Sequence, residues 1–263
     1  MQYLDEEGTN SIDILHKYAS INQYLFSTLI NSEIWFSDPA AFNDPYDCNI
    51  NYNFSSINYG TVYDHLTNSN NKFSFGSTEE YIRGRASDIS NNPIALEQQM
   101  NGFLKNTIDK RGVACFSESD KILLMWSHYA DSHKGVCLTF DIEKDLNFFS
   151  IPYKVDYLSD YPLINLFNVP EKKEVQLVLA TKSEEWAYEQ EIRIVKNKDN
   201  MPQYRDAIAF NPKALTEIKF GYKSSDEQIR TIMNLVTIKY PHVKFYTSKI
   251  KTGVFGIEFY PIN

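Results

Sequence analysis

The order of the C-terminal segments constrains the fold of this chain more than any other feature. Short runs rich in β-branched and aromatic residues predict strands over 207–210, 217–220, 243–250 and 254–260, with one helix among them. Strands joined without a helix pair antiparallel, because a parallel pair needs a long crossover connection. No regular alternation of strand and helix is present. The sequence therefore predicts an α+β fold with a mostly antiparallel sheet core.

Earlier segments add strands to this prediction. The same criteria predict strands over 33–37, 113–116, 136–140 and 188–195. The last three are expected to pair with the C-terminal strands in one sheet. No GxGxxG motif follows any of them, so a Rossmann dinucleotide site is not indicated.

Capping residues place the helices. Asn22 and Ser225 are each expected to cap a helix, and Asp120 to cap a third that ends before Gly135. A further helix is predicted over 171–182.

The middle of the chain predicts a helical insertion at about 77–110. Ser77 with Glu80 forms a capping box, and Pro93 is placed to open a second helix. At 263 residues the whole chain, 1–263, is expected to form a single domain. This insertion is expected to contribute few site residues, because it carries none of the motifs described below.

Composition limits the compartment and the partners. The formal net charge is −8 and the isoelectric point is near 5.2, so broad non-specific nucleic-acid binding is not expected. The three cysteines, Cys48, Cys115 and Cys137, are widely spaced and form no CxxC pair. No apolar run approaches membrane-spanning length. We expect a cytoplasmic protein with no membrane partner.

Two carboxylates on the strand predicted over 188–195 are the leading candidates for chemistry. Residues two apart share a strand face, so Glu189, Glu191 and Arg193 are predicted on one side, the carboxylates roughly 6–7 Å apart. Lys182 and Trp186 lie just upstream. Such a pair is suited to general acid/base catalysis or to electrostatic stabilisation of a cation. The alternative is the solvated face of an antiparallel sheet.

An aromatic stripe on the helix after Asp120 is a second candidate. Trp126, Tyr129 and His133 follow helical spacing, which predicts either a cleft wall or core packing. His128 lies off the stripe and is expected at the surface or in a cleft. Ser117 with a histidine base is disfavoured as a nucleophile, because no strained GxSxG turn surrounds it.

A turn-rich segment near residue 44 is a third candidate. Asn43, Asp44 and Pro45 are typical turn residues, which is the structural interpretation. Asp44 and Asp47 could also contribute to a metal site, although no spacing favours one metal.

Several motifs occur together in an order that resembles a known family. They are Lys17-Tyr18, Phe36-Ser37-x-Pro39, Phe42-Asn43-Asp44-Pro45-x-Asp47, Cys115-Phe116-Ser117, Met125-Trp126-x-x-Tyr129, His133-x-Gly135 and Trp186-x-x-Glu189-x-Glu191-x-Arg193. This set, over about 15–221, resembles the prokaryotic domain-of-unknown-function family twenty-nine seventy-one. Ala19 departs from the arginine expected in the opening motif. The resemblance implies a bacterial or phage protein and no particular reaction.

The motif order is also similar to that of the ADP-ribosyltransferase fold. Those enzymes carry a His or Arg on an opening strand, where this chain has Lys17-Tyr18, and an aromatic on a helix that stacks on nicotinamide. They end in a catalytic Glu, similar to Glu189-Gln190-Glu191. The resemblance implies cofactor contacts from Lys17, Tyr18, Ser117, Trp126, Tyr129 and His133, and catalysis by Glu191 or Glu189.

These observations lead to one hypothesis and two alternatives. The leading hypothesis is an enzyme of ADP-ribosyltransferase type that consumes NAD as its substrate and transfers ADP-ribose to an unidentified acceptor. Its biological role could be that of a toxin or an antiviral-defence effector. The alternatives are a metal-dependent nuclease or phosphodiesterase and a non-enzymatic module that binds a nucleotide or a protein.

The residues expected around one cleft are Lys17, Asn43, Asp44, Trp126, Tyr129, His133, Trp186, Glu189, Glu191 and Arg193. If Arg193 and Lys182 neutralise both glutamates, the cluster is a structural network. If the glutamates are instead catalytic, Glu191→Gln is expected to abolish activity and preserve the fold.

Overall fold

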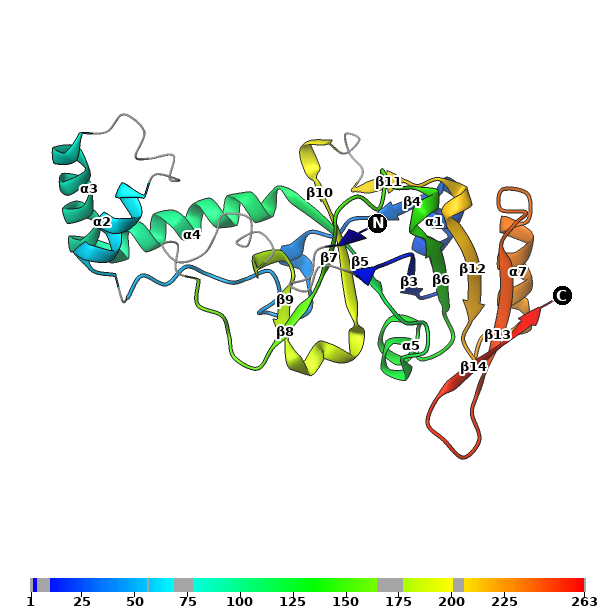
Figure 1. Cartoon of the computed structure of the whole chain (residues 1–263). Coiled ribbons are helices and arrows are strands. Elements are labelled where there is room, and N and C mark those ends of the chain that lie inside the picture. The colour runs from blue at the N-terminus through cyan, green and yellow to red at the C-terminus, as the bar shows by residue number, and fades with distance from the viewer. Residues whose placement is uncertain are drawn as a thin grey trace.

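The core of the protein is an eight-stranded sheet, as a computed structural model shows (Figure 1). The structure describes residues 2–3, 10–55, 57–68, 78–164, 177–200 and 206–262. The strands of the sheet are β3 (Ile14–Ala19), β5 (Arg111–Ser117), β6 (Val136–Asp141), β7 (Pro152–Lys154), β10 (Glu191–Asn197), β12 (Leu215–Phe220), β13 (Lys244–Ile250) and β14 (Ile257–Ile262). The spatial order is β14-β13-β12-β6-β3-β5-β10-β7.

Pairing in this sheet is antiparallel except between β12 and β13, which are parallel with α7 (Asp226–Val236) between them in sequence. This confirms the predicted α+β fold. One predicted member lies elsewhere, because β11 (Ala207–Ala209) pairs with β4 (Glu33–Trp35) in a separate two-stranded sheet. Two other small pairs are β1 (Gln2–Tyr3) with β2 (Asn10–Ser11), and β8 (Asp156–Leu158) with β9 (Thr181–Ser183).

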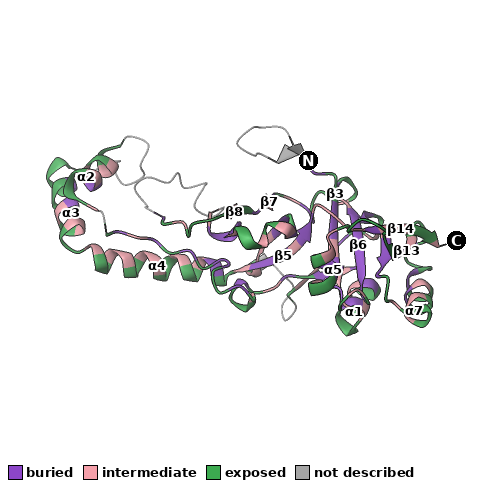
Figure 2. Cartoon of the chain, turned by 90° about the horizontal axis from the view of Figure 1, so that it is seen from below, coloured by how far each residue is buried: buried purple, intermediate pink, exposed green. Residues whose placement is uncertain are grey.

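Helices cover both faces of the sheet. On one face, α1 (Gln23–Asn31) and α7 bury residues such as Leu29 and Ile232 against Leu15 and Leu138. On the other, α5 (Leu123–Tyr129) packs near Cys137. Figure 2 shows that the central strands of the sheet are largely buried. Because side chains alternate along a strand, successive residues of β3, and likewise of β6, point to opposite faces of the sheet and join different hydrophobic cores.

A helical arm extends away from the sheet (Figures 1 and 2). It consists of α2 (Tyr59–Thr67), α3 (Glu79–Asn91) and α4 (Pro93–Asp109). Thr78 caps α3, whereas the predicted cap at Ser77 lies outside the described residues. A second core with Phe54, Ile108 and Leu179 packs where the arm meets the sheet. The sequence did not predict α2, and the division into domains stays a prediction.

Helix boundaries were predicted best where a side chain caps the helix. Asn22 accepts hydrogen bonds from two backbone amides of α1, and Ser225 forms a complete capping box on α7. The helix after Asp120 is shorter than predicted, because α5 ends at Tyr129 and three residues with positive φ follow it before Gly135.

The predicted boundary of the site-bearing strand is wrong. Residues Glu184–Glu189 form a 3-10 helix, and Gln190 adopts the left-handed conformation with φ of 47° before β10 begins. Glu189 is therefore not on the strand. The predicted helix over 171–182 ends earlier, because 181–183 form β9, and 171–176 lie outside the described residues. The remaining short 3-10 helices are Pro39–Ala41, Ile142–Lys144, Lys198–Asn200 and Pro212–Ala214.

The sheet is split between β3 and β5. All six residues of β3 pair with β6, but β3 meets β5 only where His16 faces Ser117. On its other side β5 pairs with β10 through seven residues. The backbones of β3 and β5 therefore diverge in the middle of the sheet, which leaves room for side chains from several strands.

Tight backbone packing after α5 gives a test of this fold. A Cβ atom at Gly135 would lie 2.3 Å from the carbonyl oxygen of Ala19 and 2.8 Å from the backbone of Ala130. Because these atoms are backbone, Gly135→Ala is expected to lower the free energy of unfolding by about 1–3 kcal/mol. Urea denaturation measures the change.

Gly84→Ala is the matched control. Gly84 lies in α3 with nothing within 4 Å of an added Cβ, so the change should raise the free energy of unfolding by about 0.5–1 kcal/mol. Equal midpoints for the two variants would contradict the described packing.

Candidate functional site

A pocket opens where β3 and β5 diverge. Its cavity volume is about 180 Å³, and it is open to solvent. Its walls come from β3, the loop before the arm, β5, α5, β9 and the start of β10; no side chain of α3 or α4 lines it. The lining residues are His16, Lys17, Tyr18, Phe42, Asn43, Asp47, Cys115, Phe116, Ser117, Met125, Tyr129, Lys182, Glu189 and Glu191. We call this the central pocket.

A fully buried arginine lies behind the central pocket. Arg193 has no exposed surface, and its guanidinium donates to both oxygens of Asp47 at 2.7 Å and both oxygens of Glu191 at 2.9 Å. It also donates to the backbone oxygen of Leu179 at 2.8 Å. Two bidentate pairs use the planar geometry that lysine lacks. Arg193 therefore fixes β10 to the loop that carries Asp47.

Lys182 and Tyr129 hold the second glutamate. The ammonium of Lys182 lies 2.7 Å from Oε2 of Glu189, and the Tyr129 hydroxyl donates to Oε1 at 2.6 Å. Lys182 also approaches Glu191 at 3.6 Å and Asp47 at 3.7 Å, so three carboxylates share it. The glutamates are 3% and 4% exposed, which rules out the predicted solvated strand face.

Protonation follows from these contacts. Burial alone would raise the pKa of Glu191, but the charge and hydrogen bonds of Arg193 outweigh it and lower the pKa to about 2. Burial opposes the charge of Lys182, yet Glu191 and Glu189 raise its pKa. Burial and the hydrogen bond to Glu189 raise the pKa of Tyr129, which stays a neutral donor. At neutral pH the Glu191–Arg193 pair is ionised.

Lys17 is the cation with the fewest partners in the central pocket. Its half-buried ammonium donates to the backbone oxygen of Cys115 at 3.0 Å across the split, and lies 5.2 Å from the centre of the Phe116 ring. No carboxylate among the described residues lies within ion-pair distance of it. Burial lowers its pKa. The ammonium has capacity to donate hydrogen bonds to an anion.

His16 is a pocket residue that the sequence analysis did not select. Its Nδ1 lies 3.1 Å from the hydroxyl of Thr139, which also accepts from Lys219 at 3.1 Å. Lys219 pairs with Asp120 at 2.7 Å and Glu217 at 2.6 Å. Burial lowers the pKa of His16 to about 4, so the imidazole is neutral at pH 7. The sequence signal was its position beside Lys17, in a segment where no strand was predicted.

The central pocket brings together nine of the predicted site residues. They are Lys17, Tyr18, Asn43, Asp47, Ser117, Tyr129, Lys182, Glu189 and Glu191. Ser117 donates to the backbone oxygen of Glu189 at 2.7 Å, so its hydroxyl forms a structural hydrogen bond. Tyr18 donates to the backbone oxygen of Ser119 at 2.8 Å. Arg193 supports the pocket from behind without lining it.

Five other predicted residues lie elsewhere. Trp126 is fully buried against Tyr18, so it belongs to the core of α5. His133 packs on Tyr222 after the chain turns at 131–133, which carries it off the predicted helical stripe. The other three are Asp44, which lines a different pocket, His128, which is exposed beside Tyr188, and Trp186, which covers the Lys182 ammonium at 4.5 Å.

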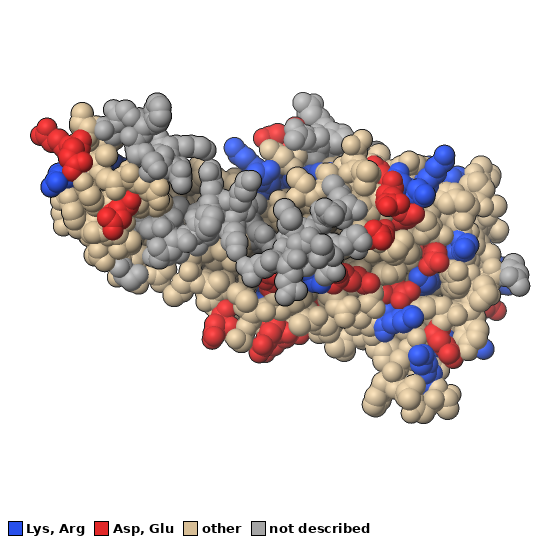
Figure 3. Space-filling model, viewed as in Figure 1, with Lys and Arg blue, Asp and Glu red and all other residues tan. Residues whose placement is uncertain are grey.

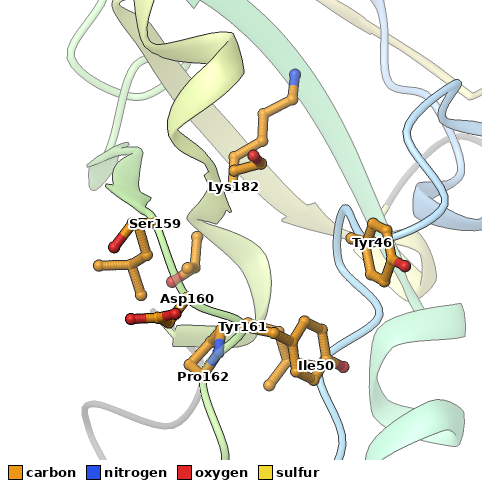
Figure 4. Close-up of a pocket in the computed structure, with 10 residues that line it drawn as sticks. Tyr46, Ile50, Ser159, Asp160, Tyr161, Pro162 and Lys182 are labelled. Atoms are coloured by element: carbon orange, nitrogen blue, oxygen red, sulfur yellow. The ribbon is translucent and has the colours of Figure 1, made fainter.

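A neighbouring pocket shares Lys182 with the central one. It is lined by Tyr46, Ile50, Tyr161 and Pro162 among others, and its two tyrosines meet edge to face at 5.8 Å. Figure 4 shows the Lys182 side chain pointing away from Tyr161 and Pro162. The ammonium therefore belongs to the carboxylate cluster and not to this neighbouring pocket.

Three further features concern possible metal ligands, surface charge and membrane-spanning helices. Among the described residues, no group of three or more His, Cys, Asp or Glu side chains is placed to hold a metal ion. In the face shown by Figure 3, acidic and basic side chains are interspersed. None of the helices described is long and apolar enough to cross a membrane.

Comparison with known proteins finds one family model that matches part of the chain. Residues 125–194 match the family model described as "Protein of unknown function (DUF2971)", which confirms the predicted resemblance over that segment. The matched segment includes Tyr129, Lys182, Glu189, Glu191 and Arg193. Neither a curated protein nor a solved structure matches the chain.

The buried ion network predicts a large stability effect at Arg193. Arg193→Met leaves Asp47 and Glu191 buried without their cation, so it should lower the free energy of unfolding by about 3–5 kcal/mol. Lys154→Met is the control, since the pair of Lys154 with Glu118 is only half-buried and should be worth less than about 1 kcal/mol. Denaturant unfolding compares the two. Similar losses would show that the network contributes little.

The low pKa of His16 predicts a specific loss of stability in acid. Between pH 6.5 and about 4 the unfolded chain binds a proton that buried His16 does not, so stability falls as the pH falls. The loss is on the order of 3 kcal/mol. His16→Asn should remove this part of the pH dependence, measured as unfolding free energies at pH 7.5 and pH 4. Parallel pH curves for the variant and the wild type would refute the neutral imidazole.

Proposed function

We propose that the central pocket binds NAD and that the chain breaks the nicotinamide–ribose bond, passing ADP-ribose to water or to a macromolecular acceptor. The observation that carries this proposal is convergence. Lys17 on β3, Tyr129 on α5 and Glu191 on β10 are distant in sequence and line one pocket. The ADP-ribosyltransferase resemblance requires such a meeting, whereas three unrelated surface positions would not produce it.

The charge of the cluster suits a cationic transition state. Asp47, Glu189 and Glu191 contribute three negative charges, and Lys182 and Arg193 contribute two positive ones, which leaves one negative charge. As the glycosidic bond breaks, positive charge develops on the ribose. A fixed negative charge beside the ribose would stabilise it.

Glu189 is the better candidate for contacting the ribose. Glu191 is bound bidentately by Arg193, which supports the structural interpretation of that pair. Glu189 faces the shared Lys182 and a neutral Tyr129 hydroxyl, so its charge is less completely balanced. We therefore assign the electrostatic role to Glu189 and a scaffolding role to Glu191, which reverses their expected order.

The other pocket residues would bind the ends of the substrate. Lys17 would donate to the pyrophosphate, since its ammonium lacks a carboxylate partner. Met125, Phe42 and the ring of Tyr129 offer apolar and aromatic surface to nicotinamide.

In the reaction the electron pair of the C1′–N1 bond leaves with nicotinamide. A water or acceptor oxygen forms the new bond to C1′ and loses its proton to solvent. This balances without an oxidant or a metal.

The cytoplasm is the proposed place of action. Cys48, Cys115 and Cys137 are all free thiols, and Cys48 and Cys137 are buried, as expected in a reducing compartment. NAD is available there to an enzyme that consumes it.

The alternative is a binding module that uses the same pocket without chemistry. The observation in its favour is that both glutamates of the central pocket have cation partners. Release of nicotinamide from NAD distinguishes the enzyme from the binding module, because a binding module would bind NAD without releasing nicotinamide.

Glu189→Gln is the decisive variant. The amide keeps the shape and loses the charge, so NAD turnover should fall by about 100-fold or more while NAD binding changes little. Chromatography of released nicotinamide and calorimetric binding measure the two. Glu191→Gln should instead lower the melting temperature, because it breaks the pair with Arg193.

Glu118→Gln is the matched control, since Glu118 pairs with Lys154 and does not line the pocket. It should keep wild-type turnover. If the wild type releases no nicotinamide, the enzyme proposal is wrong. If Glu189→Gln keeps full turnover, the role of Glu189 is wrong.

A further inference from the structure

A second cavity lies at the root of the helical arm, between α4 and the loop that follows β4. Its volume is about 490 Å³, against about 180 Å³ for the central pocket, and this is within the range of small-molecule sites. Its walls include Phe42, Asp44, Ile50, Leu104, Ile108 and Asp109. We call this cavity the arm pocket.

The carboxylate of Asp44 has one oxygen without a partner. The residue is 6% exposed, and its Oδ1 accepts from the backbone amide of Tyr46 at 2.9 Å. This bond belongs to the turn that the sequence predicts here. The other oxygen, Oδ2, is buried and accepts no hydrogen bond from any part of the chain that the structure describes. The turn therefore accounts for one oxygen of Asp44 and not for the other.

From this arrangement we propose that the arm pocket binds a small organic cation, a primary ammonium on an apolar chain, with Asp44 as its anchor. A buried carboxylate oxygen without a donor is unfavourable, so a ligand that brings an N–H group to it gains affinity. The site is separate from the proposed cleavage of NAD and does not depend on it.

The lining suits both ends of such a ligand. An ammonium carries three donors and a positive charge, which match the unpaired oxygen of Asp44. The apolar chain would pack on Ile50, Leu104 and Ile108. Lys105 also belongs to the lining, but it is exposed, and its long side chain can keep its own ammonium in water.

Other classes of ligand fit the arm pocket less well. An anion would meet the carboxylates of Asp44 and Asp109, which repel it. A bare metal ion needs several protein ligands together, and the residues that the structure describes offer no group of three or more metal-ligating side chains. A cation with an apolar body uses both the acid and the apolar wall.

The test is a titration of the full chain with hexylammonium near pH 7, followed by NMR of the backbone amides. Amide signals from 39–51 and 101–109 should shift, because these segments form the walls. 1-Hexanol has the same length and no charge, so it should bind about tenfold more weakly or worse. Methylammonium should also bind more weakly, since each buried methylene adds about threefold.

Asp44→Asn should weaken hexylammonium by about tenfold or more, because the amide can keep the bond from Tyr46 but loses the charge. Asp109→Asn is the matched control. It removes the same charge from the same pocket, but this residue is exposed, so the affinity should change by less than about threefold.

Leu104→Ala tests the site independently if Asp44→Asn does not fold. It should weaken hexylammonium and leave methylammonium unchanged, because it shortens only the apolar wall. No amide shifts at about 10 mM hexylammonium, or shifts confined to other segments, would overturn the site. Equal affinity for 1-hexanol, or equal losses in Asp44→Asn and Asp109→Asn, would overturn the role of Asp44. Melting temperatures exclude a general loss of folding.

Discussion

The buried guanidinium of Arg193 is the interaction on which the arrangement of the site depends. An arginine without exposed surface is tolerated only when its donors are satisfied, and here two carboxylates and a carbonyl do so. The carboxylates come from β10 and from the loop that precedes the arm. One side chain thereby fixes segments that are far apart in the sequence. The pairing leaves Lys182 to be shared by three acids, and that shared position sets the charge of the pocket wall.

The split between β3 and β5 provides the space that this network surrounds. A fully paired sheet would place backbone hydrogen bonds where Lys17 now reaches the carbonyl oxygen of Cys115. Because β6 pairs with the whole of β3, and β10 with the whole of β5, each strand is stabilised on its outer side. The opening therefore costs few backbone hydrogen bonds. It also places residues of β3 and β10 within one pocket, although β5 separates these strands.

Local chemistry was predictable from the sequence, and chain direction in turns was not. Asn22 capped its helix as predicted, because the cap depends on a few neighbouring residues. The meeting of Glu189 with Glu191 was predicted from strand alternation, yet Glu189 precedes the strand and Gln190 turns the chain in the left-handed region. The prediction that His133 shares a helix face with Trp126 and Tyr129 was wrong, because three left-handed residues redirect the chain after α5. Asp and His are enriched in that conformation, but neither Asp131 nor His133 requires it.

Under the proposed function, ligand binding and the charge of the site would be coupled through Lys17. The three acids of the cluster pair with two cations, Lys182 and Arg193, and the nearby ammonium of Lys17 supplies a third positive charge without forming an ion pair to them. A phosphate bound at Lys17 would take up the charge of that ammonium and leave the acids with one unmatched negative charge. The wall at Glu189 would then be most negative when a substrate is present. A site of this kind supplies its electrostatic stabilisation to the bound molecule and avoids an unbalanced buried charge in the empty state.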